Sequence, residues 1–479
     1  MNNIFELFLL DCETDENRVL FSDNEGDITY KEAKKIIVSI ASFLKNNNIV
    51  NQPILVPVTR SKKVLLTFFG IAASNNYYVP VSDDVKEDRL NDIISIGKIK
   101  YCFDFKNDKL ENLSFEEAIS TSSSREDIQS LMGNYNKNNP LYLMFTSGST
   151  GVPKGVLKSH DNILAFVENF KETFTDIEEH QIIANQTPFY FDASSKDIYL
   201  TLGLKGTLYI PSKEVFVLPN KSIEYLNDKH VSMIMWVPSA LIMVAKIRVL
   251  NFIKPQYLKY VFFIGEVFPS KYLNMWYQAL PETKFVNWFG STETAGACLY
   301  YPITRLMNDS EIAPIGKPLK NNKVVLKDGE ICISSRQVAL CYIGDEEKTK
   351  KTFVKDGDDI YLHTGDYAEY DTDGNIVFKT RKDFQIKHMG YRIELQDIEA
   401  SVMSLSYISS CCCLYIKEKI ILVAVLNDGE EKKTSEILAD LKNILADYML
   451  PNKIVLKDNM PLNANGKIDR VLLKQEMEK

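Results

Sequence analysis

Runs of β-forming residues alternate with helical stretches along most of this chain. The strand-like runs include 54–58, 77–81 and 141–145, and the helical stretches include 64–73 and 160–174. A strand, a helix and a second strand in succession build a parallel βαβ unit. The first ~380 residues are therefore expected to form a large α/β domain.

A helix start is recognisable near the N-terminus. Thr29 followed by Glu32 has the pattern of a capping box, in which each side chain accepts from the backbone amide of the other residue. Apolar residues then recur at helical spacing, namely Ile36, Ile37, Ile40, Phe43 and Leu44. We expect a helix to begin there.

The pattern changes beyond Lys382. Short strands are expected around 384–387 and 420–426. The spacing of apolar residues predicts one amphipathic helix, ended by Pro451, that contains Ile437, Leu438, Leu441, Ile444, Leu445 and Tyr448. This tail of roughly 95 residues is long enough for a small α+β domain. We expect a large domain over 1–382 and a small one over 383–479, with the polar stretch 120–139 as a surface connection.

Charge and hydropathy exclude two classes of protein. The formal net charge is −8, whereas nucleic-acid binders collect Lys and Arg to neutralise phosphates. The longest apolar run, 231–245, contains Pro238 and is shorter than the ~20 residues that cross a bilayer. The first ten residues have no basic region and include Glu6, unlike a signal peptide. We expect a cytoplasmic protein that binds no nucleic acid and is not inserted into a membrane.

The chain has eight cysteines and no CxxC pair. Cys411, Cys412 and Cys413 are adjacent within an apolar stretch. Neighbouring residues of a strand point to opposite faces, so these three thiols do not converge on one metal ion. Buried free thiols are expected.

A loop of small residues follows the run 141–145. Its sequence is Thr146, Ser147, Gly148, Ser149, Thr150, Gly151, Val152, Pro153, Lys154 and Gly155. Small residues let backbone amides approach an anion, and the hydroxyls add donors, so the loop is typical of a phosphate grip. It is not a Walker loop, because Pro153 and Gly155 stand where that motif has Gly and Ser or Thr. Taken alone, such a loop is also compatible with a flexible turn.

Seven strings in order extend this observation. They are 78–81, 146–155, 287–293, 361–366, 381–387, 390–394 and 465–470. With them the chain closely resembles, over nearly its whole length, the adenylate-forming superfamily of acyl-CoA synthetases, luciferases and adenylation domains of nonribosomal peptide synthetases. The resemblance implies an α/β fold whose large N-terminal domain combines βαβ subdomains with a distorted β-barrel, followed by a small mobile α+β domain. It also implies ATP and Mg²⁺ as cofactors.

The resemblance implies a nucleotide site, assigned residue by residue. Phe289 would stack on the adenine, Thr292 would contact the α-phosphate and Glu293 would hold Mg²⁺. Asp366 and Arg381 would bind the ribose hydroxyls, and their alternative is an ordinary ion pair. The full set expected to bind ATP is Thr146, Ser147, Gly148, Ser149, Thr150, Gly151, Lys154, Gly265, Asn287, Phe289, Gly290, Asp366 and Arg381.

Three positions of the tail also match the family. Lys467 would bridge the substrate carboxylate and the α-phosphate, and with Glu293 and Thr292 it forms the expected catalytic set. Asp383 matches the hinge about which the small domain turns between the two half-reactions. Gly390 would leave room for a pantetheine arm.

The segment Phe191 to Ser194 resembles the amino-acid-activating branch of the family. In that branch the Asp that corresponds to Asp192 binds the substrate α-ammonium, for which a carboxylate is the natural counter-ion. The alternative is that Asp192 caps the following helix. The resemblance extends the substrate site to Phe191, Asp192, Ala193, Lys196, Met235, Phe262, Ile264, Trp288, Gly296 and Ala297.

Lys196 is the unusual member of this set. Four residues after Asp192 on a helix, it either pairs with that carboxylate or faces a polar or acidic substrate side chain. Local strings at 197–199, 265–267 and 384–387 also resemble ligases that load D-alanine on a carrier protein. Ile264 and Lys196 depart from the small and the hydrophobic residue expected in a D-alanine pocket.

The expected function is that of a free-standing enzyme. No segment with a carrier-protein Ser follows Lys467 before the last residue, Lys479, so a separate phosphopantetheinylated carrier protein is expected to receive the amino acid in nonribosomal peptide synthesis. The alternatives are a D-alanine–carrier protein ligase, an acyl-CoA or aryl-CoA ligase, and a catalytically dead homologue that only binds nucleotide. Asp192 argues against the CoA ligases, and the presence of Lys467 argues against the dead homologue.

Lys467→Ala is expected to leave ATP binding nearly intact and to lower the rate of adenylation by ~10²-fold or more, because a charge that stabilises the transition state is lost. Exchange of labelled pyrophosphate into ATP measures this rate. Thioester formation from pre-formed aminoacyl-AMP serves as the control and should change much less. An unchanged exchange rate would contradict the assignment.

Overall fold

The computed structural model describes residues 3–122, 136–146, 153–308, 311–381, 385–427, 429–461 and 468–478. The chain forms two compact units. The first comprises Met1–Asp83, Ile94–Met144 and Gly155–Lys382, and the second comprises Asp84–Ile93, Phe145–Lys154 and Asp383–Lys479.

A nine-stranded sheet forms one half of the first unit. Its strands, in spatial order, are β15 (Lys317–Pro318), β14 (Leu299–Ile303), β13 (Lys284–Phe289), β12 (Tyr260–Ile264), β11 (Met233–Trp236), β9 (Ile182–Ala184), β10 (Thr207–Tyr209), β1 (Val19–Asp23) and β2 (Gly26–Thr29). The strands from β13 to β1 in this order are parallel, and antiparallel strands close both ends.

A second, seven-stranded sheet contains the strands predicted near the N-terminus. Its order is β18 (Cys341–Ile343), β8 (Lys154–Ser159), β7 (Pro140–Thr146), β4 (Tyr77–Ser82), β3 (Pro53–Val58), β5 (Tyr101–Phe103) and β6 (Glu111–Leu113). Strands β3, β4 and β7 pair in parallel, with α3 (Lys62–Ala73) between β3 and β4 in the chain. The predicted parallel βαβ pattern is confirmed.

Five further strands form a smaller antiparallel sheet in the region where the resemblance implies a distorted β-barrel. They are β16 (Lys323–Lys327), β17 (Glu330–Ser334), β20 (Asp359–Tyr370), β19 (Phe353–Asp356) and β21 (Ile376–Arg381).

The chain up to Arg381 also forms helices. They are α1 (Ile4–Thr14), α2 (Tyr30–Asn46), α4 (Glu87–Gly97), α5 (Phe115–Ser120), α7 (His160–Thr173), α8 (Ser195–Gly203), α9 (Lys213–Val217), α10 (Pro219–Asp228), α11 (Pro238–Lys246), α12 (Ser270–Ala279) and α13 (Glu346–Thr352), besides α3. Single 3₁₀ turns occur at η1 (Asp192–Ser194) and η2 (Val249–Asn251). The capping box predicted at Thr29 and Glu32 is present at the start of α2.

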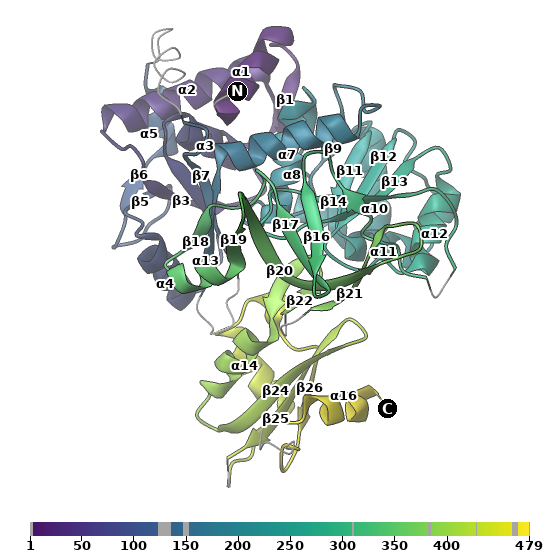
Figure 1. The fold of residues 1–479 in the computed structure, drawn as a ribbon. Helices are drawn as coiled ribbons and strands as arrows, with labels where there is room; N and C mark the ends of the chain where they lie inside the picture. Colours follow the sequence, from purple (N-terminus) through teal and green to yellow (C-terminus); the bar gives the residue numbers. More distant parts are fainter. Residues whose placement is uncertain are drawn as a thin grey trace. The chain divides into compact units, whose positions relative to one another are not determined.

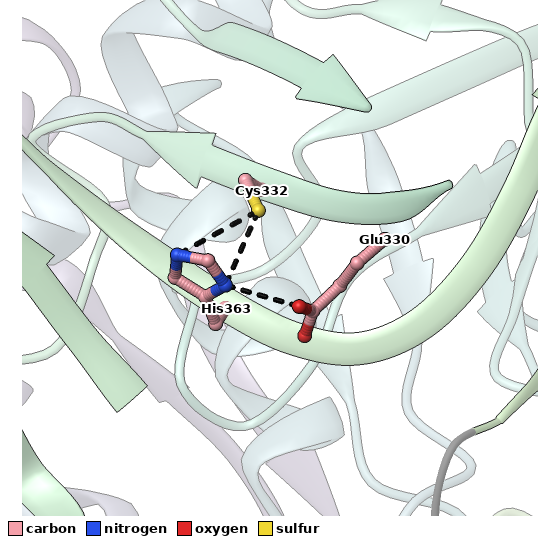
Figure 2. A group of neighbouring side chains, drawn as sticks. All are labelled: Glu330, Cys332 and His363. Atoms are coloured by element: carbon pink, nitrogen blue, oxygen red, sulfur yellow. Dashed lines mark hydrogen bonds and ion pairs between the residues drawn. The ribbon is translucent and has the colours of Figure 1, made fainter. Parts of the chain in front are cut away.

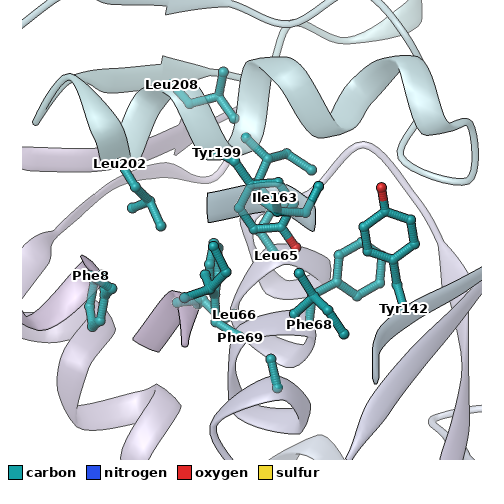
Figure 3. Close-up of a cluster of buried hydrophobic side chains, with 14 of the residues drawn as sticks. Phe8, Leu65, Leu66, Phe68, Phe69, Tyr142, Ile163, Tyr199, Leu202 and Leu208 are labelled. Atoms are coloured by element: carbon teal, nitrogen blue, oxygen red, sulfur yellow. The ribbon is translucent and has the colours of Figure 1, made fainter. Parts of the chain in front are cut away.

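One hydrophobic core joins the two large sheets. Side chains of β3 and β4 belong to the same buried cluster as those of β12 and β13, and helices α7 and α8 contribute to it from between the sheets (Figure 1). Figure 3 shows part of this cluster, with Tyr199 and Leu202 of α8 near Phe69 of α3. Burial of this apolar surface holds the sheets together, and it brings β7 of one sheet into contact with η1, just before α8, at Tyr142 and Asp192.

The second unit contains an α+β tail. Its elements are β22 (Gln385–His388), β23 (Tyr391–Glu394), α14 (Leu395–Met403), β24 (Ile408–Ile416), β25 (Lys419–Leu426), α15 (Thr434–Lys442), η3 (Asp447–Met449), β26 (Lys453–Leu456) and α16 (Arg470–Glu478). Strands β24, β25 and β26 form one sheet.

The helix predicted from Ile437 to Tyr448 is wrong in its extent. Helix α15 ends at Lys442, and Tyr448 belongs to the 3₁₀ turn η3. Leu445 and Met449 are buried in the same cluster as Ile437. A shorter helix followed by a 3₁₀ turn therefore buries the same apolar residues as one continuous helix would, and apolar spacing alone does not distinguish the two arrangements. The helix ends well before Pro451.

The predicted arrangement of the adjacent cysteines is confirmed. Cys411 and Cys413 lie in one hydrophobic cluster of the sheet and Cys412 lies in another. All three thiols are free and buried. In the described part of the chain no helix is both long and apolar enough to cross a membrane.

At Gly70 of α3 the backbone comes close to Ile40 of α2. A Cβ atom there would lie 2.5 Å from Cγ2 and 2.6 Å from Cβ of Ile40. Contacts this short force packed side chains or backbone to move. The absence of a side chain at Gly70 therefore sets the distance between the two helices.

Gly70→Ala is expected to destabilise the protein by ~1–3 kcal/mol, because overpacking outweighs the better helix propensity of Ala. Thermal unfolding measures the effect as a lower melting temperature. Ile40→Ala is destabilising by itself, but in that background Gly70→Ala should cost less than in the wild type, since the clashing Cγ2 atom is absent. A melting temperature equal to that of the wild type would contradict the close approach.

Candidate active site

The predicted nucleotide-site residues of the first unit follow parallel strands of the nine-stranded sheet. Gly265 comes directly after β12, and Gly290 to Glu293 come directly after β13. The two strands are adjacent and parallel. Their carboxyl ends therefore meet at one edge, which is where open α/β sheets bind ligands.

Backbone and packing hold the residues expected around the base. The side-chain amide of Asn287 donates to the carbonyl of Pro314 at 2.8 Å. Phe289 belongs to a buried cluster that includes Leu299 and Leu362. A Cβ atom on Gly290 would lie 2.4 Å from the carbonyl oxygen of Gly296, so the loop after β13 passes very close to itself. Stacking of Phe289 on adenine stays a prediction.

The carboxylate of Glu293 is buried, with an exposed fraction of 3%. The Tyr342 hydroxyl, on β18 of the other large sheet, donates to Glu293 Oε1 at 2.7 Å. Thr292, the neighbouring predicted residue, is half-buried. A buried carboxylate oxygen of fixed orientation is the kind of ligand that Mg²⁺ prefers, so Glu293 fits the metal role that the resemblance implies.

Asp366 and Arg381 form an ion pair across neighbouring strands. Arg381 Nη1 donates to Asp366 Oδ1 at 2.7 Å, and Nη2 donates to the carbonyl of Thr364 at 3.3 Å. The two residues are register partners in β20 and β21. The ion pair that sequence reasoning weighed as an alternative is present, and ribose binding stays a prediction.

Glu330, Cys332 and His363 form a side-chain group just before Asp366 (Figure 2). His363 Nδ1 lies 3.0 Å from Glu330 Oε2 and 3.5 Å from Cys332 Sγ. Glu330 Oε1 also accepts from the backbone amide of Gly365 at 2.8 Å. These atoms could offer three ligands to a cation, but mutual hydrogen bonds already account for them. We interpret the group as a support for the part of β20 that carries Asp366.

Asp192 lies in η1 and is half-buried. The Tyr142 hydroxyl, on β7, donates to Asp192 Oδ1 at 2.7 Å. The helix-cap alternative is not what the structure contains, because α8 is capped at Ser194 and neither η1 nor α8 has a side-chain cap bond. The carboxylate is therefore oriented by a tyrosine from the other sheet.

Burial raises the pKa of Asp192 above its ordinary value, and the Lys158 ammonium and the Tyr142 hydrogen bond oppose this rise. Burial likewise keeps the pKa of Tyr142 well above its usual range, so its hydroxyl stays a donor. Behind the pair, the hydroxyls of Tyr78 and Tyr199 lie 2.7 Å apart, and the Tyr78 and Tyr142 rings are 5.4 Å apart. This tyrosine group fixes the position of Asp192.

Several residues expected around the substrate side chain come from adjacent strands. Met235 pairs in register with Phe262, and Ile264 pairs with Trp288. The Phe262 and Trp288 rings are 4.2 Å apart. Met235, Phe262, Trp288 and Ala297 are at most 1% exposed and Ile264 is 7% exposed. These side chains pack closely against one another, and such packing favours a small substrate side chain.

The remaining members of that set have more exposed surface. Phe191, Ala193 and Gly296 are half-buried, like Asp192. The Phe191 ring packs against Tyr190, with centroids 4.5 Å apart. Gly296 has a φ of +63°, and a Cβ atom there would lie 2.4 Å from the ring of Phe166. Only glycine suits this position.

Lys196 does not pair with Asp192 by a salt bridge in the part of the chain that is described. Its buried ammonium donates instead to the carbonyl of Ala193. Burial lowers the pKa of Lys196, and the Asp197 carboxylate opposes this most. Asp197 accepts from Asn185 at 2.7 Å, and burial raises its pKa to about 6.

The structure describes only part of the predicted site. Ser147, Gly148, Ser149, Thr150, Gly151, Asp383 and Lys467 lie outside the described residues. Thr146 ends β7, and Lys154, which begins β8, forms an ion pair with Glu394 of the same unit. Gly390 lies in the turn between β22 and β23 with a φ of +82°.

The sequence motifs do not include several residues that bond the site from positions distant along the chain. Besides Tyr142 and Tyr342, the buried Gln337 amide donates to the carbonyls of Ala295 and Ala297 at 2.6 and 2.9 Å. These bonds hold the loop that follows Glu293. Nothing local in the sequence indicates them, because about forty residues separate donor and acceptor.

Comparison with known proteins decides the family. A model of the family described as AMP-binding enzyme matches residues 10–343. The chain belongs to this AMP-binding enzyme family.

Curated relatives match over almost the full length. The D-alanine–D-alanyl carrier protein ligase of Staphylococcus haemolyticus is 30% identical, with 98% of each chain covered. The ligase of the same name from Lactococcus lactis is 29% identical, with 99% of this chain and 98% of that one covered.

Solved structures share the fold at lower identity. The Vibrio cholerae adenylation domain AlmE, in complex with glycyl-adenosine-5'-phosphate, aligns with a TM-score of 0.84 at 17% identity, covering 99% of this chain and 97% of that chain. The fused adenylation and carrier di-domain NpsA-ThdA from Klebsiella oxytoca aligns with a TM-score of 0.82 at 20% identity, covering 95% and 93%. The α/β fold of an adenylation domain is confirmed.

Tyr142→Phe is expected to move the acid limb of the activity profile to higher pH by about one unit. Only the ionised form of Asp192 binds an ammonium, and loss of a donor to a carboxylate, worth ~1.5–3 kcal/mol, raises its pKa further. Lys158, Lys196 and Glu293 also act on Asp192 and are unchanged. The measurement is kcat/KM for pyrophosphate exchange from pH 5 to 9.

Tyr199→Phe is the matched control for this variant. It removes a buried hydroxyl of the same tyrosine group that bonds Tyr78 rather than Asp192. Its acid limb should stay close to that of the wild type. Equal shifts in both variants would mean that Tyr142 acts on packing rather than on the carboxylate.

Proposed function

We propose that this protein activates an amino acid with ATP as an aminoacyl-AMP and transfers it to the phosphopantetheine thiol of a separate carrier protein. The observation that carries the proposal is the Asp192 carboxylate, half-buried and oriented by Tyr142 without serving as a helix cap. Such a carboxylate suits a substrate α-ammonium. The ligase names of the relatives support AMP-forming, ATP-dependent chemistry on an amino acid.

The first half-reaction joins two anions. An oxygen of the substrate carboxylate attacks the α-phosphorus of ATP, and the bond to the β-phosphate breaks to release pyrophosphate. In our assignment Thr292 contacts the α-phosphate, Asp366 and Arg381 hold the ribose, and Lys467 neutralises the charge that builds up between the reactants. Mg²⁺ held by Glu293 would neutralise the phosphate oxygens.

The second half-reaction uses the stored energy of the anhydride. The thiol of the carrier's phosphopantetheine arm attacks the acyl carbon, a thioester forms, and AMP leaves with the electron pair of the broken bond. Asp192 would keep the α-ammonium, and so the acyl group, in place during both steps. Asp383 is assigned as the hinge and Gly390 as the point where the arm passes.

D-alanine is the second candidate substrate. Two observations favour it: both full-length relatives named above are D-alanine–D-alanyl carrier protein ligases, and the aromatic packing of Phe262 on Trp288 favours a small side chain. Against it stand Ile264 and the buried ammonium of Lys196. An acyl-CoA or aryl-CoA ligase would have no use for Asp192.

Asp192→Ala is expected to lower kcat/KM for the amino acid by ~10²-fold or more, about 3 kcal/mol, since the α-ammonium is left without a partner in a partly desolvated site. The same acid without its amino group should be a poor substrate of the wild type and should lose much less in the variant. Pyrophosphate exchange over a panel of L- and D-amino acids first identifies the substrate for this comparison.

Asp192→Asn is the control of similar shape, and it should show nearly the same loss because it lacks the charge. Equal proportional losses for the amino acid and for its deaminated analogue would contradict the ammonium role. A wild type that prefers the deaminated acid would favour the CoA ligase alternative.

A further inference from the structure

A lysine that the sequence motifs do not include lies in the interior, and its charge acts on Asp192. Lys158 is on β8, in the second large sheet, and its exposed fraction is 0%. Its Nζ atom is buried and has no hydrogen-bond partner among the described residues. An ammonium is among the groups least often buried without a partner, so this one calls for a counter-ion.

Two carboxylates act on the Lys158 ammonium. They are Asp192 and Glu293, the residues assigned to the substrate α-ammonium and to Mg²⁺. Neither makes a salt bridge to Lys158 in the part of the chain that is described. When the substrate amine and the metal ion bind, both carboxylates gain cationic partners of their own. Lys158 is then left in a positive environment unless a bound ligand brings a further anion.

Lys196 provides a second buried ammonium whose charge acts on Asp192. It comes from α8, whereas Lys158 comes from β8, and the charges of both act on the Asp192 carboxylate. Lys196 is 1% exposed and bonds only the backbone carbonyl of Ala193 among the described residues. Asp197, which acts on it most strongly, already accepts from Asn185. The charges of two buried ammonium groups thus act on one carboxylate.

The other side chains expected around the substrate are apolar and offer no anion. They are Ala193, Met235, Phe262, Ile264, Trp288 and Ala297, with Gly296 adding no side chain. A neutral amino acid would leave the Lys158 ammonium without a hydrogen-bond partner and Lys196 with only a backbone carbonyl. A site built this way discriminates strongly in favour of a ligand that supplies the missing group.

We propose that the amino acid activated by this enzyme carries an anionic side chain, and that Lys158 together with Lys196 supplies its counter-charge. The proposal rests on the function proposed above and specifies the substrate class of the same site. The close packing of Phe262 on Trp288 limits the length of that side chain, so a short carboxylate such as that of aspartate fits better than a long one.

Matched pairs of amino acids test the charge without changing the shape. The wild-type enzyme with ATP and Mg²⁺ is assayed by pyrophosphate exchange with aspartate and asparagine, glutamate and glutamine, alanine and glycine, each chiral one as both stereoisomers. We expect the best acidic substrate to exceed its amide by on the order of 10²-fold in kcat/KM. A preference for alanine, glycine or the amides over the acids would overturn the proposal.

Lys158→Met keeps the length and apolar stem of the side chain and removes the charge. Because Lys158 also lowers the pKa of Asp192, both enzymes are compared at a pH at which Asp192 is ionised in the variant as well. There the variant should lower kcat/KM for the acidic substrate by on the order of 10²-fold, and kcat/KM for the matching amide should change less than about threefold. Lys196→Met should act in the same direction. Lys35→Met, at an exposed position of α2, is the control and should change neither substrate.

Stability provides a second readout, because Lys158→Met removes a buried charge without a partner. Its melting temperature should equal or exceed that of the wild type. If Lys158 only balanced the charges of Asp192 and Glu293, the variant would lower kcat/KM equally for acidic and neutral amino acids. That result would overturn the proposal.

The outcomes also separate this proposal from the function on which it rests. If none of the amino acids supports pyrophosphate exchange and a deaminated acid does, the proposed function is contradicted. Exchange with neutral amino acids alone would leave that function intact and refute only the anionic side chain.

Discussion

The hydrogen bond from Tyr142 to Asp192 is the contact on which the substrate site depends. It joins β7 of one large sheet to η1, which precedes α8, across 50 positions of the chain. A desolvated carboxylate is costly, and the bond compensates part of that cost while it fixes the direction of the carboxylate. The packing of α7 and α8 between the sheets, which buries the shared core, keeps donor and acceptor at this distance.

The same packing explains why charged groups gather around Asp192. Lys158 lies on β8, Lys196 on α8 and Glu293 in the loop after β13. The charges of all three affect the pKa of Asp192. In a region of low polarity such charges interact strongly and each needs a partner. Two ammonium groups and two carboxylates therefore form one electrostatic unit, whose balance changes when a substrate amine or a metal ion is added.

Local sequence patterns predicted much of the fold. The alternation of strand and helix predicted parallel βαβ units, and β3, β4 and β7 pair accordingly. The Thr29 capping box is formed, because its atoms lie within one helical turn. Cys411 and Cys412 face opposite sides of β24, as the pleat of a strand requires. Where two local solutions bury the same apolar residues, as after Lys442, the pattern was not sufficient.

By itself the sequence determined the family, the α/β layers and the identity of most candidate residues, because short motifs and apolar periodicity are encoded within a few neighbouring positions. Only the tertiary structure decided that Asp192 bonds Tyr142 instead of capping a helix, that Tyr342 orients Glu293, and that Lys158 is fully buried. In the chain Lys158 is an ordinary lysine before Ser159 and His160. Elements distant in sequence bury this lysine, and that burial distinguishes it from the many exposed lysines of the chain.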